Sequence, residues 1–434
     1  MVYVQNHLGQ PLMPTQDHRK VRLLLKAGAA VVVRRTPFTI RLTTRTKTYV
    51  QPVILGVDAG SKTVGMSAVT FGESHVATRK EELFAAELTP RNDVVKNLSD
   101  RRELRRSRRN RTTRYRQPRF NNRVHSKHKG WLAPSVEVKI QEHITGIKRA
   151  CEILPVGRVV IETAEFDLQL LKAIADGRPV PQGEDYQKGE MYGFYNVRQY
   201  VFWRDGYACR CCGAHGKGVK FHTHHLESRK TGGNAPDDLV TVCDKCHKAF
   251  HAGLITDAKL KKRSRPSTRD AAFMGIMRKT LLQRLRAELP VPVVETRGYI
   301  TKATRERFLK LPKSHTNDAL AIAMGRHGFG IEEVTYMPQS GRIYQIKPVR
   351  HHNRQLHKAI PKKGGRRQRS QGPKYVQGFR RFDKVWYRGQ ECFIWGLRTS
   401  GYFQLKLIDG TKIHESAKAG ELALLERSSG YLIA

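Results

Sequence analysis

Residues 53–60 read VILGVDAG, a mainly apolar run that ends in one acid and a glycine. Such a run is typical of a buried strand, and the glycine after Asp58 indicates a turn. Residues 64–70 (VGMSAVT) and about 75–84 (HVATRKEELF) have a similar β-type composition and are separated by Gly-containing turns. Together the three runs predict an antiparallel meander.

Further acids occupy comparable positions later in the chain. Glu162 ends the apolar run GRVVIE, which predicts another buried strand, and residues 314–325 (SHTNDALAIAMG) predict a helix with His315 and Asp318 at its start. Those two residues are three apart and share a helix face. Because α/β proteins place sites at the carboxyl ends of strands, these residues and Asp58 are candidate site residues. An acid after a strand is more often a turn or cap residue, so only the combination is informative.

Carboxylates with a neighbouring histidine suit metal-dependent phosphodiester hydrolysis. The reaction needs an activated water, a stabilised pentavalent phosphate and a stabilised leaving oxygen, and two divalent ions can supply all three. Mg²⁺ prefers oxygen ligands, so Asp58, Glu162 and Asp318 are predicted to bind Mg²⁺, or Mn²⁺ in its place. His315 is predicted to act as a further ligand or to transfer a proton.

The charge of the chain indicates a polyanionic partner. The 434 residues contain 80 Lys and Arg against 38 Asp and Glu, a net charge of +42, which attracts DNA or RNA. Charge alone leaves open a ribosomal-type or chromatin-type protein without catalytic activity. No run of about 18 apolar residues is present, so no membrane span is predicted, and residues 1–10 lack the pattern of a secretory signal.

Residues 91–130 concentrate this charge, with 15 Lys and Arg against three acids. Within them, residues 101–116 (RRELRRSRRNRTTRYR) contain no Pro or Gly and predict a helix. Like charges at this density repel one another unless phosphates lie alongside, so we predict a helix that contacts nucleic acid. The alternative is a disordered basic segment.

Five of the seven Cys fall between positions 209 and 246, which in a cytosolic chain indicates metal binding more than disulfides. They form two C-x-x-C pairs and leave Cys211 as a spare. The spacing predicts tetrahedral structural zinc with ligands Cys209, Cys212, Cys243 and Cys246. Four thiolates leave no open position, so this zinc would stabilise a module too small to have its own core.

Histidines flank the second pair of cysteines, and the order C-x-x-C, H-H, G-G-N, D-D-L-V-T-V, C-x-x-C-H-x-x-x-H resembles the HNH nucleases. The resemblance implies a ββα hairpin with one divalent ion. It implies His225 as the general base, His224 and His247 as metal ligands, and His251 as a further candidate ligand. A neutral imidazole near its ordinary pKa suits that base. The alternative is a zinc ribbon that binds nucleic acid without cutting it.

One position departs from the HNH pattern. Asp238 occupies the place where that family has an Asn, and Asn234 lies a few residues earlier. An ionised Asp accepts hydrogen bonds but does not donate them, so the bracing of the hairpin is expected to differ.

The order strand–Asp58, strand–Glu162, then His315 and Asp318 at a helix start resembles the RuvC-type member of the RNase H-like fold. The implied fold class is multi-domain α/β. An RNase H-like core is split by an Arg-rich bridge helix and by a zinc-containing ββα HNH insertion, and a small β module lies at the C-terminus.

This nested order, together with PLMP at residues 11–14, resembles the IscB family, transposon-associated relatives of the RNA-guided type II CRISPR effector nucleases. The implied domains are an N-terminal PLMP domain (1–50), RuvC parts (51–90, 131–195 and 257–334), the bridge helix (91–130), the HNH domain (196–256) and a C-terminal β domain (335–434).

The IscB resemblance also implies partners and a division of labour. A structured omega RNA would carry the guide and pair with one strand of double-stranded DNA. HNH would cut the paired strand and RuvC the displaced strand, while the C-terminal domain would bind RNA and read a target-adjacent motif. The arginines implied to bind guide-RNA phosphates are Arg101, Arg102, Arg105, Arg106, Arg108, Arg109 and Arg111. The protein would be monomeric within a cytoplasmic ribonucleoprotein of a bacterium or archaeon.

Several other segments carry predictions of structure. Helices are expected over 135–151 and 270–288, and a strand over 291–300 (VPVVETRGYI). Residues 340–381 contain 13 Lys and Arg and no acid, which indicates a linker or a nucleic-acid-bound loop. Short runs from residue 382 onward predict a small β-barrel.

Two other functions remain compatible with these patterns. One is an unguided HNH/RuvC endonuclease that reads DNA by itself, and the other is a catalytically inert scaffold that binds nucleic acid. The intact set of Asp58, Glu162, His225 and Asp318 argues against the scaffold.

Overall fold

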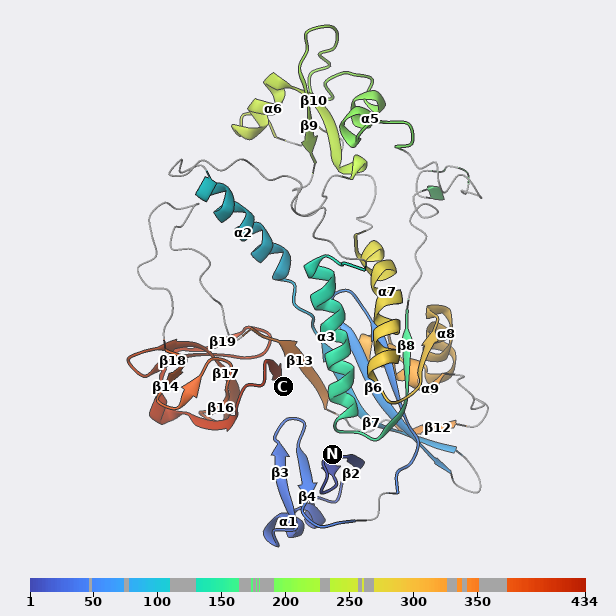
Figure 1. Cartoon of the computed structure of the whole chain (residues 1–434), viewed down its shortest axis with the longest axis vertical. Helices are drawn as coiled ribbons and strands as arrows, with labels where there is room; N and C mark the ends of the chain where they lie inside the picture. Colours follow the sequence, from blue (N-terminus) through green and yellow to red (C-terminus); the bar gives the residue numbers. More distant parts are fainter. Residues whose placement is uncertain are drawn as a thin grey trace. The chain divides into compact units, whose positions relative to one another are not determined.

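The chain divides into two compact units, and each is described by itself (Figure 1). The sheet unit comprises residues 1–164 and 276–434, and the Cys/His unit comprises residues 165–275. The computed structural model describes residues 1–46, 49–73, 78–109, 130–163, 173–174, 177, 179, 191–226, 235–256, 260, 269–325, 334–337, 342–350 and 373–434. In that part of the chain, no helix combines the length and apolarity that a membrane span requires.

An eight-stranded sheet forms the centre of the sheet unit, in the order β11-β8-β5-β6-β7-β13-β21, with β12 also paired to β7. Its strands are β5 (Val53–Ala59), β6 (Val64–Glu73), β7 (Thr78–Leu88), β8 (Val156–Glu162), β11 (Val293–Thr296), β12 (Val334–Met337), β13 (Ile343–Pro348) and β21 (Tyr431–Ile433). Strands β5, β6 and β7 pair antiparallel, which confirms the predicted meander, and β8 pairs parallel with both β5 and β11.

The helices of this unit are α2 (Val94–Arg109), α3 (Pro134–Cys151), α7 (Arg269–Glu288), α8 (Gly298–Ala303), the π-helical turn η5 (Thr304–Leu309) and α9 (His315–Met324). Helix α2 contacts α3 and does not lie on the sheet (Figure 1). Met66 of β6 lies against Gly146 of α3, while the neighbouring Gly65 lies against α9. Because successive residues of a strand point to opposite faces, α3 and α9 cover opposite sides of the sheet.

Two sequence-based predictions need correction in this unit. The run predicted as a strand over 291–300 ends at Thr296, and α8 begins at Gly298. The segment predicted as a linker contains β13, whose alternating buried positions Tyr344 and Ile346 show a half-buried strand. The predicted helices over 135–151 and 270–288 are confirmed by α3 and α7.

Two smaller sheets flank the central one. The first has the order β2-β1-β4-β3, and its strands are β1 (Val2–Gln5), β2 (Pro11–Thr15), β3 (Ala30–Arg34) and β4 (Thr39–Leu42). Helix α1 (His18–Lys26) connects β2 to β3. The second has the order β19-β18-β17-β16-β20, and its strands are β16 (Lys384–Tyr387), β17 (Gln390–Arg398), β18 (Tyr402–Lys406), β19 (Lys412–Lys418) and β20 (Ala423–Glu426). The helical turn η6 (Ala419–Glu421) connects β19 to β20. A separate pair is formed by β14 (Tyr375–Val376) and β15 (Phe379–Arg380).

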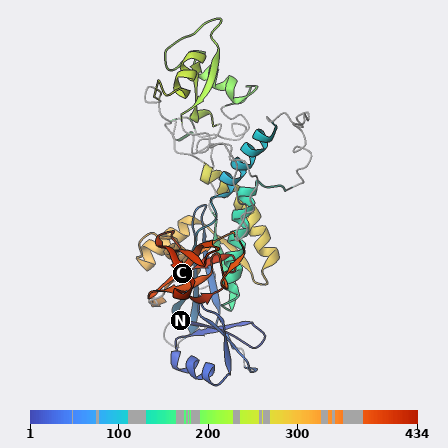
Figure 2. The ribbon, with the colours of Figure 1, turned by 90° about the vertical axis from the view of Figure 1, so that its left-hand side faces the viewer.

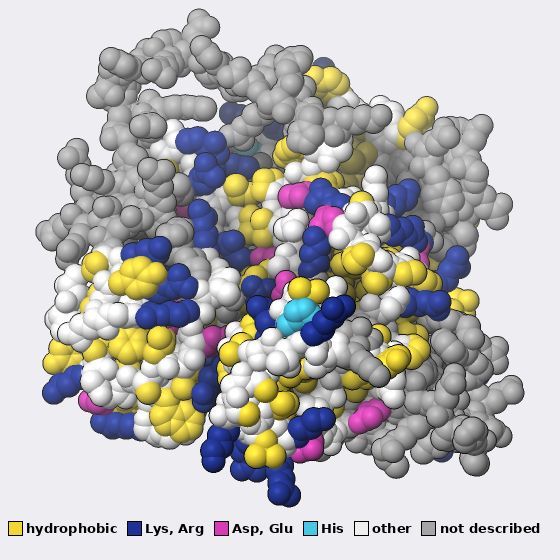
Figure 3. All heavy atoms as spheres, turned by 60° about the horizontal axis from the view of Figure 1, so that its bottom comes forward, with side chains coloured by type: hydrophobic (Ala, Val, Ile, Leu, Met, Phe, Trp, Pro, Cys, Tyr) yellow, Lys and Arg dark blue, Asp and Glu magenta, His cyan; other side chains and the backbone are white. Residues whose placement is uncertain are grey.

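The predicted C-terminal barrel is an open sheet among the described residues, because β19 and β20 lie at its two edges. This sheet (red) and the N-terminal sheet (blue) lie next to each other in Figure 2. Lys384 is buried between them, where its Nζ donates to Thr36 Oγ1 (2.9 Å) and lies 2.7 Å from Glu391. Lys and Arg side chains spread over the face shown in Figure 3.

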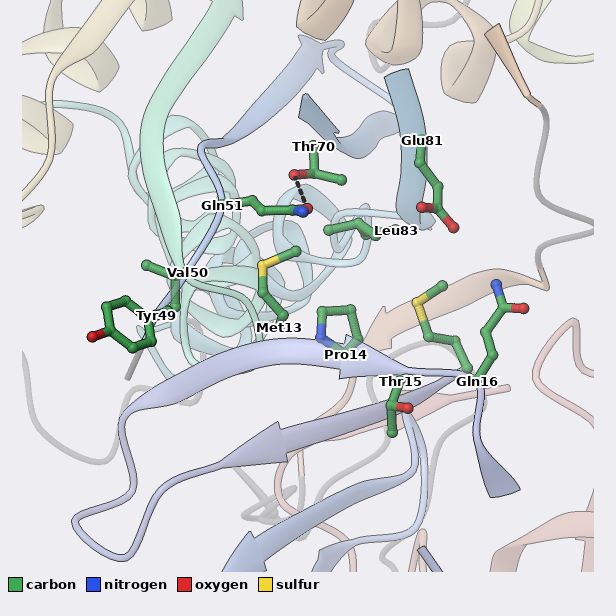
Figure 4. A pocket seen from close by; sticks show the side chains of 11 residues that line it. Met13, Pro14, Thr15, Gln16, Tyr49, Val50, Gln51, Thr70, Glu81 and Leu83 are labelled. Carbon is green, nitrogen blue, oxygen red and sulfur yellow. Dashed lines mark hydrogen bonds between the residues drawn. The ribbon is translucent and has the colours of Figure 1, made fainter. Parts of the chain in front are cut away.

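A pocket of 640 Å³ lies between β2 and strands β6 and β7 (Figure 4). Its lining is mixed: Met13 and Leu83 are apolar, and Glu81 is charged. Within this lining (Figure 4), Thr70 Oγ1 donates to Gln51 Oε1 (3.2 Å). The PLMP segment therefore forms part of a wall against the central sheet.

The Cys/His unit contains a hairpin flanked by helices. Its elements are α5 (Val197–Arg204), β9 (Phe221–His225), η3 (Pro236–Asp238), β10 (Leu239–Cys243) and α6 (Asp244–His251). Strands β9 and β10 pair antiparallel, with His225 opposite Leu239. The order β9-β10-α6 is the ββα arrangement that the resemblance to the HNH nucleases implied.

Glu142 gives the sheet unit a testable pH dependence. It is buried on α3, where its Oε2 accepts a hydrogen bond from the Arg91 N–H (2.7 Å), and burial raises its pKa to about 7. A group whose folded-state pKa is raised stabilises the fold below its ordinary pKa, and that stability is lost as the pH rises through about 7. We expect Glu142→Gln to raise the free energy of unfolding at pH 8, relative to the wild type, by roughly 1–3 kcal/mol.

The measurement is the urea midpoint of both proteins at pH 4.5 and pH 8. Glu137→Gln on the same helix is the control with the opposite sign, because a hydrogen bond from Arg284 lowers the pKa of Glu137. If the difference in urea midpoint between Glu142→Gln and the wild type were the same at pH 4.5 and at pH 8, the expectation would be contradicted.

Candidate functional site

Asp58 and Glu162 lie side by side at the carboxyl ends of two parallel strands. In the register of β5 with β8, Asp58 is directly opposite Glu162. The residues before each acid, Val57 and Ile161, are fully buried. The two carboxylates are therefore neighbouring polar groups at the edge where a sheet of this kind places its site.

Helix α9 brings His315 to the same edge. Its N-cap, Ser314, accepts a hydrogen bond from the Asn317 N–H (3.0 Å), which starts the helix at His315. His315 Nδ1 lies 2.7 Å from Asp58 Oδ2 and donates to it. Asp318 follows one turn later on the same helix.

Two glycines, which the sequence reading did not single out, allow α9 to approach the sheet. A Cβ atom on Gly56 would lie 2.1 Å from the Ala319 carbonyl oxygen, and one on Gly65 would lie 1.9 Å from the His315 carbonyl oxygen. Glycine within a strand often marks such a close backbone approach, which was the available signal.

Gly65→Ala is expected to push α9 away from the sheet and to separate His315 from Asp58. Overpacking of this kind destabilises a fold by about 1–3 kcal/mol or more. We expect a lower urea midpoint and a loss of any activity that depends on Asp58. Gly157→Ala is the matched control, since a Cβ there would meet only the Val53 carbonyl oxygen at 3.8 Å. Equal effects of the two substitutions would contradict the role given to Gly65.

Arg305 holds Asp318 and was missed by sequence reasoning. Its side chain is 7% exposed, and its guanidinium donates both to the Asp318 carboxylate and to Glu306 (2.7 Å). Arg305 lies in the π-helical turn η5, and such turns are frequent at functional sites. No motif in the sequence marks this residue.

Helix α3 holds the turn that follows Asp58. Lys139 Nζ donates to the Ser61 carbonyl oxygen (2.6 Å). The ring of His143 lies 2.7 Å from the Lys139 carbonyl oxygen through Nδ1 and 3.1 Å from that of Gly60 through Nε2. Burial lowers the pKa of His143, while the two carbonyl contacts act in the opposite direction. The ring lies between these two carbonyl groups and supports the turn.

The charges at this edge suit a divalent cation. Burial raises the pKa of Glu162, and the nearby carboxylates of Asp58 and Asp318 act in the same direction. The hydrogen bond with Asp58 raises the pKa of His315. A cation would relieve the repulsion between the acids, and oxygen donors fit Mg²⁺ or Mn²⁺. Within the described residues, the three acids do not gather within 4.8 Å of one another, and Asp318 is paired with Arg305.

In the Cys/His unit, the four predicted zinc ligands come together. The sulfur atoms of four cysteines all lie within 4.8 Å of one another: Cys209, Cys212, Cys243 and Cys246. Cys211 is outside this set. Four thiolates gathered in this way are the ligand set of a tetrahedral zinc site.

A second cluster in this unit consists of His224, His247 and His251, whose nitrogen atoms also lie within 4.8 Å of one another. His251 Nε2 is 3.3 Å from His247 Nε2. Burial lowers the pKa of His247, and the neighbouring imidazoles act in the same direction, which favours the neutral form that binds metals. These three residues fit a divalent ion.

His222 belongs to the same face of the hairpin and was not predicted. Its ring stacks on His247 with centroids 4.8 Å apart, and its Nε2 donates to Asp244 Oδ1 (3.0 Å). The alternation of β9 places positions 222 and 224 on one side, and this was the available signal.

His225 is the last residue of β9 and is not among the three clustered histidines. Asp238 is fully buried, and its carbonyl oxygen accepts a hydrogen bond from the Leu226 N–H (2.8 Å). Position 238 thus braces the hairpin through its backbone. Asn234 lies outside the described residues.

The predicted Arg-rich helix is present as α2. Arg101, Arg102 and Arg105 have exposed positions on it. Arg106, Arg108 and Arg109 lie within the bounds of the helix, but their side chains, like the whole of Arg111, are outside the described part of the chain.

Comparison with known families identifies two segments. Residues 209–253 match the family model described as HNH endonuclease, and residues 2–189 match the one described as RRXRR protein. The sequence RRSRR at 105–109 fits the letters of the second description. The chain therefore contains an HNH endonuclease domain, and the two matches support a nuclease.

Solved structures similar to this chain include two of Streptococcus thermophilus Cas9, at 14% identity in each case. The Cas9 structure in complex with the AGAA PAM has a TM-score of 0.29 and a match that covers 44% of this chain and 26% of that one. The Cas9 structure in complex with the GGAA PAM has a TM-score of 0.30 and covers 54% and 30%, respectively. This chain thus spans less than a third of those proteins, and no curated protein matches it.

Proposed function

We propose that the protein is an RNA-guided DNA endonuclease of the IscB type, with one nuclease centre in each unit. The observation that carries the proposal is the presence of two separate groups of catalytic residue types. One is the pair Asp58 and Glu162 at adjacent strand ends, and the other is the histidine cluster of the HNH domain. Two centres of this kind suit a substrate with two strands.

In the sheet unit, Asp58, Glu162 and Asp318 would hold Mg²⁺ or Mn²⁺, which when bound polarises the phosphate and activates water. The order of strands, a three-stranded meander with two parallel strands added beside its first strand, supports the RuvC-type, RNase H-like assignment. Because His315 Nδ1 donates to Asp58, Nε2 is the nitrogen at which this ring would take or return a proton or join the ligands. Arg305 keeps the Asp318 carboxylate oriented through their ion pair.

In the Cys/His unit, His224, His247 and His251 would hold a divalent ion and His225 would take the proton from water. His222 supports this set by stacking on His247 while Asp244 fixes its ring. The four-cysteine cluster would bind a zinc that holds the hairpin and α6 together.

The exposed arginines of α2 and the net charge of +42 support an RNA partner as well as DNA. We further propose that a structured omega RNA supplies the guide, that HNH cuts the guide-paired strand and that the RuvC-like centre cuts the displaced strand. Base pairing would read the sequence, and the C-terminal β sheet would take part in reading a short flanking motif.

The test is to express the protein together with its native flanking DNA, to purify it and to sequence the RNA that accompanies it. The expected result is one abundant, structured RNA encoded beside the gene, and cutting that follows a changed guide end. A mixture of host RNAs, with cutting that needs none of them, would support an unguided endonuclease instead. Absence of cutting with RNA and Mg²⁺ present would support an inert scaffold.

A further inference from the structure

The segment between β11 and α9 forms one side of the acidic edge and exposes two aromatic rings. A Cβ atom on Gly298 would lie 2.9 Å from Glu162 Oε1, so the backbone of α8 is in direct contact with that carboxylate. At the other end of the segment, Arg305 binds Asp318. Figure 1 shows α8 beside β8 and near α9.

Tyr299 follows Gly298 directly and points its ring toward solvent. Consecutive Cα atoms are about 3.8 Å apart, so the Tyr299 Cα is at most roughly 8 Å from Glu162 Oε1. The residue is nevertheless 70% exposed, and Phe308 on η5 is 56% exposed. Among the described residues, neither ring stacks on another ring or on a cation. Both rings are therefore accessible to a ligand.

The surroundings of these rings are basic. Residues 297–313 contain six Lys and Arg against one acid, Glu306. Arg305 is buried against Asp318, while the other five are exposed: Arg297, Lys302, Arg307, Lys310 and Lys313. Aromatic rings interleaved with exposed cations form the surface on which single-stranded nucleic acids bind, because bases stack on the rings while phosphates contact the cations.

We propose that Tyr299, supported by Phe308, is a stacking platform that selects an unpaired strand for the acidic centre. This inference rests on the proposed nuclease function of Asp58 and Glu162 and names the residues that determine its substrate class. A base can stack on Tyr299 only if it has left its own duplex stack. With the scissile phosphate at the acids, a neighbouring nucleotide is within reach of the ring.

Binding tests the platform without requiring cleavage. The full chain is titrated with a fluorescent single-stranded oligonucleotide and with a duplex of the same sequence, in Ca²⁺ to prevent cutting. Tyr299→Ala is expected to weaken single-strand binding about ten- to hundredfold, the range found for loss of one base–aromatic stack, and to leave duplex binding unchanged. Tyr299→Phe keeps the ring and is expected to restore the affinity.

A matched control and a modified substrate separate stacking from other effects. Tyr195→Ala removes a ring that is 94% exposed in the other unit and is expected to change nothing. An oligonucleotide with abasic sites near its middle is expected to bind the wild type and Tyr299→Ala equally, because no base is present to stack. Phe308→Ala is expected to reduce single-strand affinity by a smaller factor than Tyr299→Ala.

Strand-resolved cutting in a His225→Ala background then links the platform to chemistry. Tyr299→Ala is expected to slow the remaining cut by a similar factor, and Tyr299→Phe to restore it. The proposal would be overturned if Tyr299→Ala weakened duplex binding as much as single-strand binding. It would also be overturned if this substitution weakened binding of the abasic oligonucleotide as much as binding of the intact one. If the wild type cut nothing but still preferred the single strand through Tyr299, the platform would stand and the nuclease function of the acidic centre would fail.

Discussion

Asp58→Ala is expected to abolish cutting of one DNA strand while the other strand is still cut at its normal rate. Asp58 is opposite Glu162 in the sheet and accepts the hydrogen bond of His315, so its removal leaves the proposed metal site without its central ligand. A loss of roughly 10³-fold or more at that strand is in the range seen when a catalytic group is deleted. Plasmid DNA would accumulate as nicked circles instead of linear product.

Two comparisons make this expectation specific. Asp58→Asn keeps an acceptor for His315 but lacks the charge that binds Mg²⁺, so it is expected to fail like the alanine variant. His225→Ala is expected to nick the opposite strand. If either single substitution stopped both cuts while DNA binding persisted, the assignment of two independent centres would be wrong.

Cys246→Ser is expected to remove the zinc and, with it, the cutting of the strand assigned to the HNH domain. Cys246 is 7% exposed and its sulfur lies among those of Cys209, Cys212 and Cys243. In small zinc modules the free energy of metal binding is largely the free energy of folding, on the order of 10 kcal/mol. We therefore expect the HNH-dependent cut to fall by at least about 10²-fold, with the Asp58-dependent cut retained.

Cys211→Ser provides a matched control from the same knuckle, since Cys211 lies outside the four-sulfur set. Zinc content by mass spectrometry, limited proteolysis of residues 191–256 and strand-resolved cutting are the measurements. Cys211→Ser should retain the metal, resist protease and cut both strands. Retention of zinc by Cys246→Ser, or its loss from Cys211→Ser, would show that the ligand set is assigned incorrectly.

The sequence predicted the elements that carry the candidate residues but not the contacts between them. Apolar runs that end in an acid identified β5 and β8, and the cysteine spacing identified the four clustered sulfurs. These features are local in the chain. The parallel register that sets Asp58 opposite Glu162 joins residues about a hundred positions apart, and no local pattern specifies it.

The errors have physical causes that can be named. The strand expected over 291–300 stops early because Gly298 must lie against Glu162, a tertiary contact that overrides the apolar pattern. The strand β13 was hidden by the basic residues around it, although Tyr344 and Ile346 show the period of two. Arg305 depends on a π-helical turn, which has no recognised sequence signature.

The return of β21 to the central sheet has a consequence for how this protein can vary. Strand β13 leaves the sheet at Pro348, and β21 comes back to pair with β13 antiparallel, so all residues between them form one excursion from two adjacent strands. The Cys/His unit likewise lies in the connection between β8 and β11. Because each excursion starts and ends at neighbouring strands, a change in its length need not alter the register of β5 with β8. The same central sheet could therefore carry different inserted domains at these two connections.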